Sequence, residues 1–104
     1  MNKISHYQIV LSKIKENKKL FYMFEKVYVF GSILYKNTPN DLDLLVVYNN
    51  QTKQHVVSYY KAKIVNTLNQ CIDLEVHCLA MSEKEILESQ FLNHIINYNQ
   101  LFLN

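Results

Sequence analysis

The sequence predicts an α/β (α+β) fold in which a small mixed sheet of three to four strands is flanked by helices. Apolar residues recur at helical spacing in three segments, near residues 4–24, 52–69 and 82–96. Between them lie short runs rich in β-branched and aromatic residues: KVYVF (26–30), LDLLVVY (42–48) and CIDLEVHCLA (71–80). Alternation of helices and strands is typical of layered folds in which helices cover a sheet.

The first half of the chain predicts helix, strand, loop and strand. Apolar residues from Ile4 to Phe24 predict one long or two short helices before the strand at 26–30. That strand ends at Gly31, and residues 33–40 contain the only proline, which predicts a loop with at most one helical turn. The run 42–48 is apolar on both faces, so we expect it to be a central strand.

The second half predicts helix, strand and helix. Residues 52–69 carry an apolar stripe, and the strand at 71–80 places Ile72, Leu74 and Val76 on one face. Ser82 and Glu85 form an S-x-x-E capping box, which opens a helix expected to continue through Ile95 and Ile96. The apolar tail LFLN is expected to dock on the core or on a partner.

Length and composition indicate one globular domain. The chain has 104 residues, of which 49% are hydrophobic and 19% charged, so we expect residues 1–104 to form a single domain. No apolar run approaches the ~18 residues of a membrane-spanning helix, and the N-terminus lacks the apolar core of a secretion signal. Cys71 and Cys78 lie in an apolar run, which predicts inert thiols in a reducing compartment. We therefore expect a cytoplasmic protein without a membrane partner.

The charge pattern argues against nucleic acid as a partner. The formal net charge is +2, and all eleven basic residues are lysines. Nucleic-acid readers are expected to show a basic face and to use the bidentate guanidinium group of arginine. Neither feature is present in this sequence.

Gly31 is the only glycine in the chain, and Ser32 follows it at the end of a predicted strand. Glycine is required where the backbone adopts a positive φ or must approach a ligand closely. We expect Gly31 to serve such a backbone role next to a ligand. The alternative is a plain turn from strand to loop.

Two pairs of acidic residues are candidates for a metal site. Asp41 and Asp43 are two residues apart in a strand, so their carboxylates project from the same face and repel each other unless a cation lies between them. Mg²⁺ prefers such oxygen ligands. Asp73 and Glu75 repeat the spacing, and one of them could complete a site with three carboxylates that holds two ions. The alternative for each pair is an exposed acidic strand end without a ligand.

The four histidines are weaker candidates for the metal site than the acidic residues. His77 alternates with Glu75 on the same strand face, so it could line the site. The other three, His6, His55 and His94, stand on separate predicted helices, and we expect surface or satisfied positions for them.

Taken together, FGS, eight residues further on DLDLLVVY, and later IDLEV resemble the DNA polymerase β-like nucleotidyltransferase superfamily, and in particular its minimal nucleotidyltransferase (MNT) domains. The resemblance spans residues 26–80. It implies a nucleotidyltransferase fold and a signature of Gly-Ser, an acidic D-x-D on the next strand, and a third acid one strand later.

The resemblance also implies roles for these residues. Gly31 and Ser32 would hold the phosphates of the nucleotide. Both acids of the D-x-D motif would bind two Mg²⁺ ions, and Asp73 or Glu75 would be the third carboxylate, which also accepts the proton of the acceptor hydroxyl. The implied reaction is Mg²⁺-dependent transfer of AMP from ATP to a hydroxyl group of a partner protein or small molecule. A histidine after the acid would favour Glu75, whereas an apolar-D-apolar pattern would favour Asp73.

Minimal relatives are often paired with a small helical HEPN-type protein, which implies that this chain is the antitoxin-like half of a two-gene HEPN/MNT pair or that it associates with itself. The sequence departs from many relatives in having no arginine after Gly-Ser and no second glycine in the spacer. The alternative function is therefore a catalytically degenerate module of the same fold that acts by binding a helical partner through its apolar C-terminal helix and tail.

Overall fold

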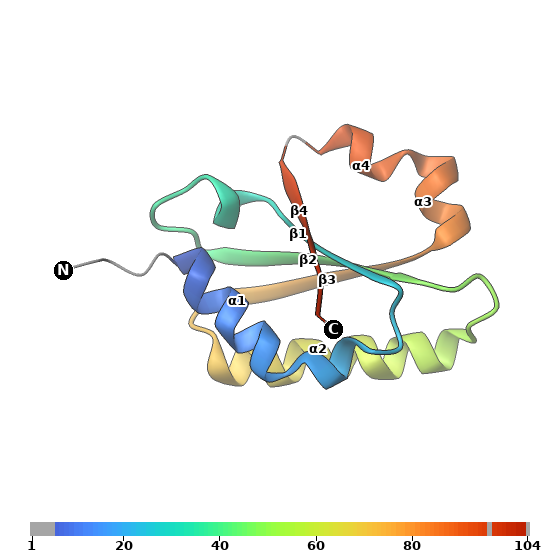
Figure 1. The fold of residues 1–104 in the computed structure, drawn as a ribbon, viewed down its shortest axis with the longest axis horizontal. Coiled ribbons are helices and arrows are strands. Elements are labelled where there is room, and N and C mark those ends of the chain that lie inside the picture. Colours follow the sequence, from blue (N-terminus) through green and yellow to red (C-terminus); the bar gives the residue numbers. More distant parts are fainter. Residues whose placement is uncertain (1–5, 96, 104) are drawn as a thin grey trace.

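The computed structural model describes residues 6–95 and 97–103, and it contains helices on a four-stranded sheet (Figure 1). This confirms the predicted fold class. In chain order the elements are α1 (His6–Glu16), η1 (Lys18–Phe21), β1 (Lys26–Phe30), η2 (Ser32–Leu34), β2 (Asp41–Tyr48), α2 (Gln54–Cys71), β3 (Glu75–Ser82), α3 (Glu83–Ser89), α4 (Phe91–His94) and β4 (Tyr98–Leu101). Within the described residues, no helix has the length and apolar character needed to cross a membrane.

The strand order is β3-β2-β1-β4, so β2 is an interior strand, as its two apolar faces predict. Strands β1 and β4 run antiparallel to each other, and β1 is also antiparallel to β2. Strand β3 is parallel to β2. A parallel pair requires a long crossover connection, and α2 provides it.

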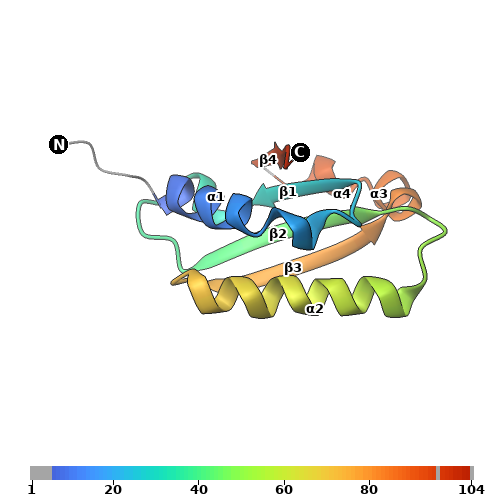
Figure 2. The ribbon, with the colours of Figure 1, turned by 60° about the horizontal axis from the view of Figure 1, so that its bottom comes forward.

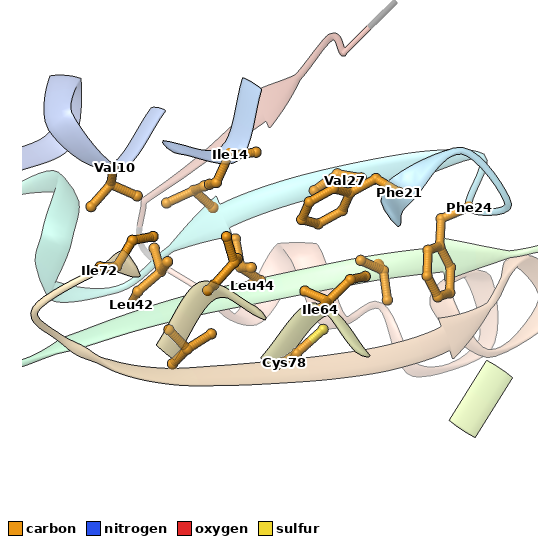
Figure 3. Close-up of a cluster of buried hydrophobic side chains, with 14 of the residues drawn as sticks. Val10, Ile14, Phe21, Phe24, Val27, Leu42, Leu44, Ile64, Ile72 and Cys78 are labelled. Carbon is orange, nitrogen blue, oxygen red and sulfur yellow. The ribbon is translucent and has the colours of Figure 1, made fainter. Parts of the chain in front are cut away.

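The larger apolar cluster lies on one face of the sheet. Figure 2 shows α2 running along β2 and β3. Figure 3 shows that side chains from α1, from α2 and from the sheet meet in this cluster. Leu42 and Leu44 point into this cluster from β2, Ile14 from α1 and Ile64 from α2, and all four are fully buried. These positions follow from the alternation of side chains along β2 and from the helical stripe in α2.

The opposite face of the sheet carries a smaller apolar cluster, to which α3 and α4 contribute. Leu45 and Val47 of β2 pack there with Tyr28 of β1, and Ile86 and Phe91 from α3 and α4 lie against them. Helix α3 lies where β2 and β3 finish (Figure 2), and α4 leads from it toward the end of β1, where Phe91 contacts Phe30. The first residues of β2 and β3 on this face therefore stay accessible.

The third strand begins at Glu75 and not at residue 71. Helix α2 continues through Cys71 and ends at Ile72, whose N–H donates to the carbonyl of Leu68 at 2.8 Å. The two cysteines, both free thiols, differ in burial: Cys71 is exposed on the last turn of α2. Cys78 is buried in β3, and burial raises the pKa of its thiol to about 12.

The C-terminal helix begins as predicted but does not continue through Ile95. The capping box is present: Glu85 N–H donates to Ser82 Oγ at 3.1 Å, and Ser82 N–H donates to Glu85 Oε1 at 3.0 Å. Gln90 then adopts a left-handed conformation with φ 52°, which ends α3 and separates it from α4. Ile95 is extended, and Ile96 lies outside the described residues.

The predicted apolar tail is in part a fourth strand. Residues Tyr98–Leu101 pair with β1, and Leu101 and Leu103 pack against the larger cluster, as docking of the tail on the core predicts. Phe102 between them is 75% exposed, and Asn104 is outside the described residues.

Candidate functional site

Gly31 ends β1 in a conformation that only glycine adopts readily, with φ 85° and ψ −157°. A Cβ atom at this position would overlap Oδ2 of Asp43 and lie 3.3 Å from its Cγ. The turn of η2 follows at once, where Lys36 N–H donates to the Ser32 carbonyl at 2.8 Å. The prediction that the only glycine serves a backbone role is confirmed, because it permits both the positive φ and the approach of Asp43.

The register of β2 against β3 brings polar residues together on the accessible face. Asp41 is the partner of Glu75, and Asp43 is the partner of His77. Paired residues of neighbouring strands point to the same face, so all four side chains project from the face that carries α3 and α4, near the first residues of β2 and β3.

Asp41, Glu75 and His77 form a cluster in which one ligand atom from each lies within 4.8 Å of the others. His77 Nε2 is 3.7 Å from Asp41 Oδ1 and 3.7 Å from Glu75 Oε1. The side chain of Asp41 is 45% exposed, that of His77 51% and that of Glu75 72%, so an ion could reach them from solvent. Two carboxylates and an imidazole are a donor set that suits a divalent metal ion. The three residues therefore form a candidate site for one divalent metal ion.

Asp43 lies between this cluster and Gly31. Its pKa is raised, mainly because burial disfavours the charged form; the charge of Asp41 adds to this, while His77 acts in the opposite direction. Because its Oδ2 packs against Gly31, Asp43 joins the cluster to the turn that follows β1. Its ligand atoms are not among those of the three-residue cluster.

Asp73 does not belong to the cluster of Asp41, Glu75 and His77. It is exposed in the bend between α2 and β3. Of the two candidates for the third acid, the structure thus places Glu75 beside Asp41. The histidine two residues later occupies the same face, as strand alternation predicts for His77.

A pocket of about 240 Å³ borders Gly31. Its wall is formed by residues from β1, the end of η2 and the connection from α4 to β4: Phe30, Gly31, Tyr35, His94, Ile95 and Asn97. Apart from Gly31, none of them was a candidate from the sequence; His94 is exposed, as expected, and also lines this pocket. They are distant in sequence and share no motif, so only the fold could bring them together.

No protein-family model and no curated protein sequence matches this chain. Solved structures do match it. The structure of one proposed nucleotidyltransferase superposes on this chain with a TM-score of 0.56 and 20% sequence identity, and the match covers 86% of this chain and 97% of the other. A second, from Sulfolobus solfataricus, shares a TM-score of 0.51 and 19% identity, over 98% of this chain and 91% of the other. At this identity the likeness concerns the fold, and the chain has the fold of these nucleotidyltransferases.

Proposed function

We propose that this protein is a metal-dependent nucleotidyltransferase that transfers AMP from ATP to a hydroxyl group of a partner protein or small molecule. One observation carries the proposal: the register of β2 and β3 gathers Asp41, Glu75 and His77 on the accessible face, next to Asp43 and Gly31. The fold shared with proposed nucleotidyltransferases supports the same reaction class.

In this proposal the residues of the site have separate roles. Asp41 and Asp43 hold two divalent ions, and Glu75 and His77 complete the donor set. When bound there, divalent ions would supply neutralisation of the charge on the triphosphate and on the attacking oxygen. Gly31 and Ser32 position the phosphates through the turn that they open. Much of the barrier is lowered by such positioning and by charge neutralisation.

The chemical step conserves atoms and charge. The oxygen of the acceptor hydroxyl forms a bond to the α-phosphorus, the bond between that phosphorus and the bridging oxygen breaks, and pyrophosphate leaves. The hydroxyl proton passes to the carboxylate of Glu75. That side chain is 72% exposed, which leaves room for an acceptor to approach it.

Mg²⁺ is the ion that the resemblance implies, and Mn²⁺ is a transition-metal ion that accepts the same carboxylate ligands. Both Mg²⁺ and Mn²⁺ are therefore needed in any test.

The decisive experiment is calorimetric titration with ATP, with and without Mg²⁺ or Mn²⁺. We expect metal-dependent binding that Asp41→Asn and Glu75→Gln each weaken at least about 10-fold, since loss of even an outer-shell partner of a metal site has such an effect. Asp73→Asn is the matched control, because it removes the same charge from an exposed position outside the cluster.

Two results would contradict the proposal. One is the absence of metal-dependent ATP binding in the unmodified protein. The other is an equal loss of binding in Asp73→Asn, which would indicate that only the overall charge matters. Circular dichroism of each variant separates loss of binding from loss of fold.

A helical HEPN-type partner, or a second copy of the chain, is proposed to present the acceptor. Support comes from the C-terminal region, where Leu87 of α3 is 78% exposed and Phe102 is 75% exposed. The alternative function, a degenerate module that only binds such a partner, makes a different prediction. A pure binding module should tolerate Asp43→Asn, whereas the enzyme should lose activity.

A further inference from the structure

We propose that the pocket formed by Phe30, Tyr35, His94, Ile95 and Asn97 beside Gly31 holds the adenine base of the nucleotide. This inference rests on the proposed function, and it assigns the base to a part of the molecule outside the carboxylate cluster. The pocket is called the base pocket below.

The base pocket and the metal cluster are neighbours through one residue. Gly31 lines the pocket and also lies against Asp43. Asp43 is in turn the register partner of His77, which belongs to the cluster. A ligand that extends past Gly31 would therefore have one end in the pocket and its other end among the carboxylates.

The residues that line the base pocket come from separate elements. One of them, Phe30, is packed against a neighbouring ring. Phe30 pairs with Asp43 across β1 and β2, so the two side chains share a face of the sheet. Its ring contacts Phe91 of α4 edge to face, with centroids 5.8 Å apart and planes at 82°. Tyr35, at the end of η2, is 64% exposed, so its ring is accessible to a ligand.

The lining suits an uncharged, flat, aromatic group. The pocket contains two aromatic rings, an imidazole and an isoleucine, and none of the described residues that line it is a lysine or carries a carboxylate. A phosphate would find no cation there, whereas a base can stack on tyrosine or phenylalanine. The side-chain amide of Asn97 carries a donor and an acceptor, which is the pair that matches N7 and N6 of adenine.

The test compares ATP with tripolyphosphate, which has the same charged chain and no base. Both are titrated by calorimetry into the full chain in the same Mn²⁺ or Mg²⁺ buffer. We expect ATP to bind more tightly than tripolyphosphate. Tyr35→Ala should weaken ATP about 10-fold, which is the lower range for loss of one stacking partner, and should leave tripolyphosphate binding unchanged.

Two further variants sharpen the result. His94→Ala removes a different wall of the base pocket, on α4, and should also weaken ATP alone. Tyr59→Ala is the matched control, because Tyr59 is a similarly exposed tyrosine, at 56%, on α2. It should change neither affinity.

Equal affinity of the unmodified protein for ATP and tripolyphosphate would overturn the base pocket and leave the metal cluster intact. An equal loss of both ligands in Tyr35→Ala would also overturn it, because the tyrosine would then act on the phosphate end. If the unmodified protein binds neither ligand, the proposed function itself fails, and the base pocket fails with it.

Discussion

At the scale of single residues, Gly31 is the position where backbone and site depend on each other most directly. Gly31→Ala would place a Cβ against Asp43 Oδ2 and hold a non-glycine residue at φ 85°. We expect a loss of about 1–3 kcal/mol in the free energy of unfolding, the usual range for such strain. Urea denaturation measures it. In an Asp43→Ala background the overlap is removed, so Gly31→Ala should cost less there. An equal cost in both backgrounds would show that the backbone angle alone accounts for the effect.

Some site residues could be predicted from the sequence and others could not. Gly31, Asp41 and Asp43 lie in two local patterns, a strand end and an alternating strand, and both patterns survive in the fold. The choice between Asp73 and Glu75 depends on where β3 begins, which is set by the end of α2 at Ile72. The base pocket depends on contacts between distant segments, for which the sequence carries no local signal.

At the scale of elements, the N-terminus of α3 is tied to β2. Glu85 accepts hydrogen bonds from the Ser82 N–H and from Tyr48 Oη, the latter at 3.1 Å, and Tyr48 Oη also accepts from Gln54 Nε2 at 3.0 Å. The hydrogen bond from the Ser82 backbone, then those from the Tyr48 and Ser82 side chains, lower the pKa of Glu85 below its ordinary value of 4.5. The ionised carboxylate therefore stabilises the helix start and links it to the central strand.

Replacing Glu85 by glutamine keeps a capping-box residue but removes the negative charge at the helix start, so it should lower stability by about 0.5 kcal/mol near neutral pH. Because the folded-state pKa of Glu85 is lowered, this contribution is fully present above 4.5 and is lost as the pH falls through the folded-state pKa. Urea denaturation of both proteins between pH 7 and low pH should show the two curves converging in acid. Glu88→Gln, an exposed change later in α3, is the control; a constant gap at all pH values would contradict the ionic role.

The elements that sequence patterns missed are those whose existence depends on a neighbour. The strand YNQL has little apolar alternation, and β4 forms because the free edge of β1 offers it hydrogen-bond partners. The break at Gln90 has a similar cause, since α4 must turn to place Phe91 against Phe30. By contrast, KVYVF and the Ser82 capping box are local signals, and both are found where the sequence predicts them.

At the scale of the whole molecule, one sheet serves both apolar clusters. Val46 and Val47 are adjacent in β2 and point into opposite clusters, so neither cluster can lose its order without disturbing the strand that the other requires. We therefore expect a single cooperative unfolding transition. Ile64→Val in the larger cluster should lower stability by about 1 kcal/mol, and Val47→Ala in the smaller one by about 1–2 kcal/mol. Each should shift the same urea transition, with circular dichroism and tyrosine fluorescence coincident. If Val47→Ala instead produces an early, separate loss of helical signal, then α3 and α4 form an independent layer, and the His94 wall of the base pocket would open before the metal cluster does.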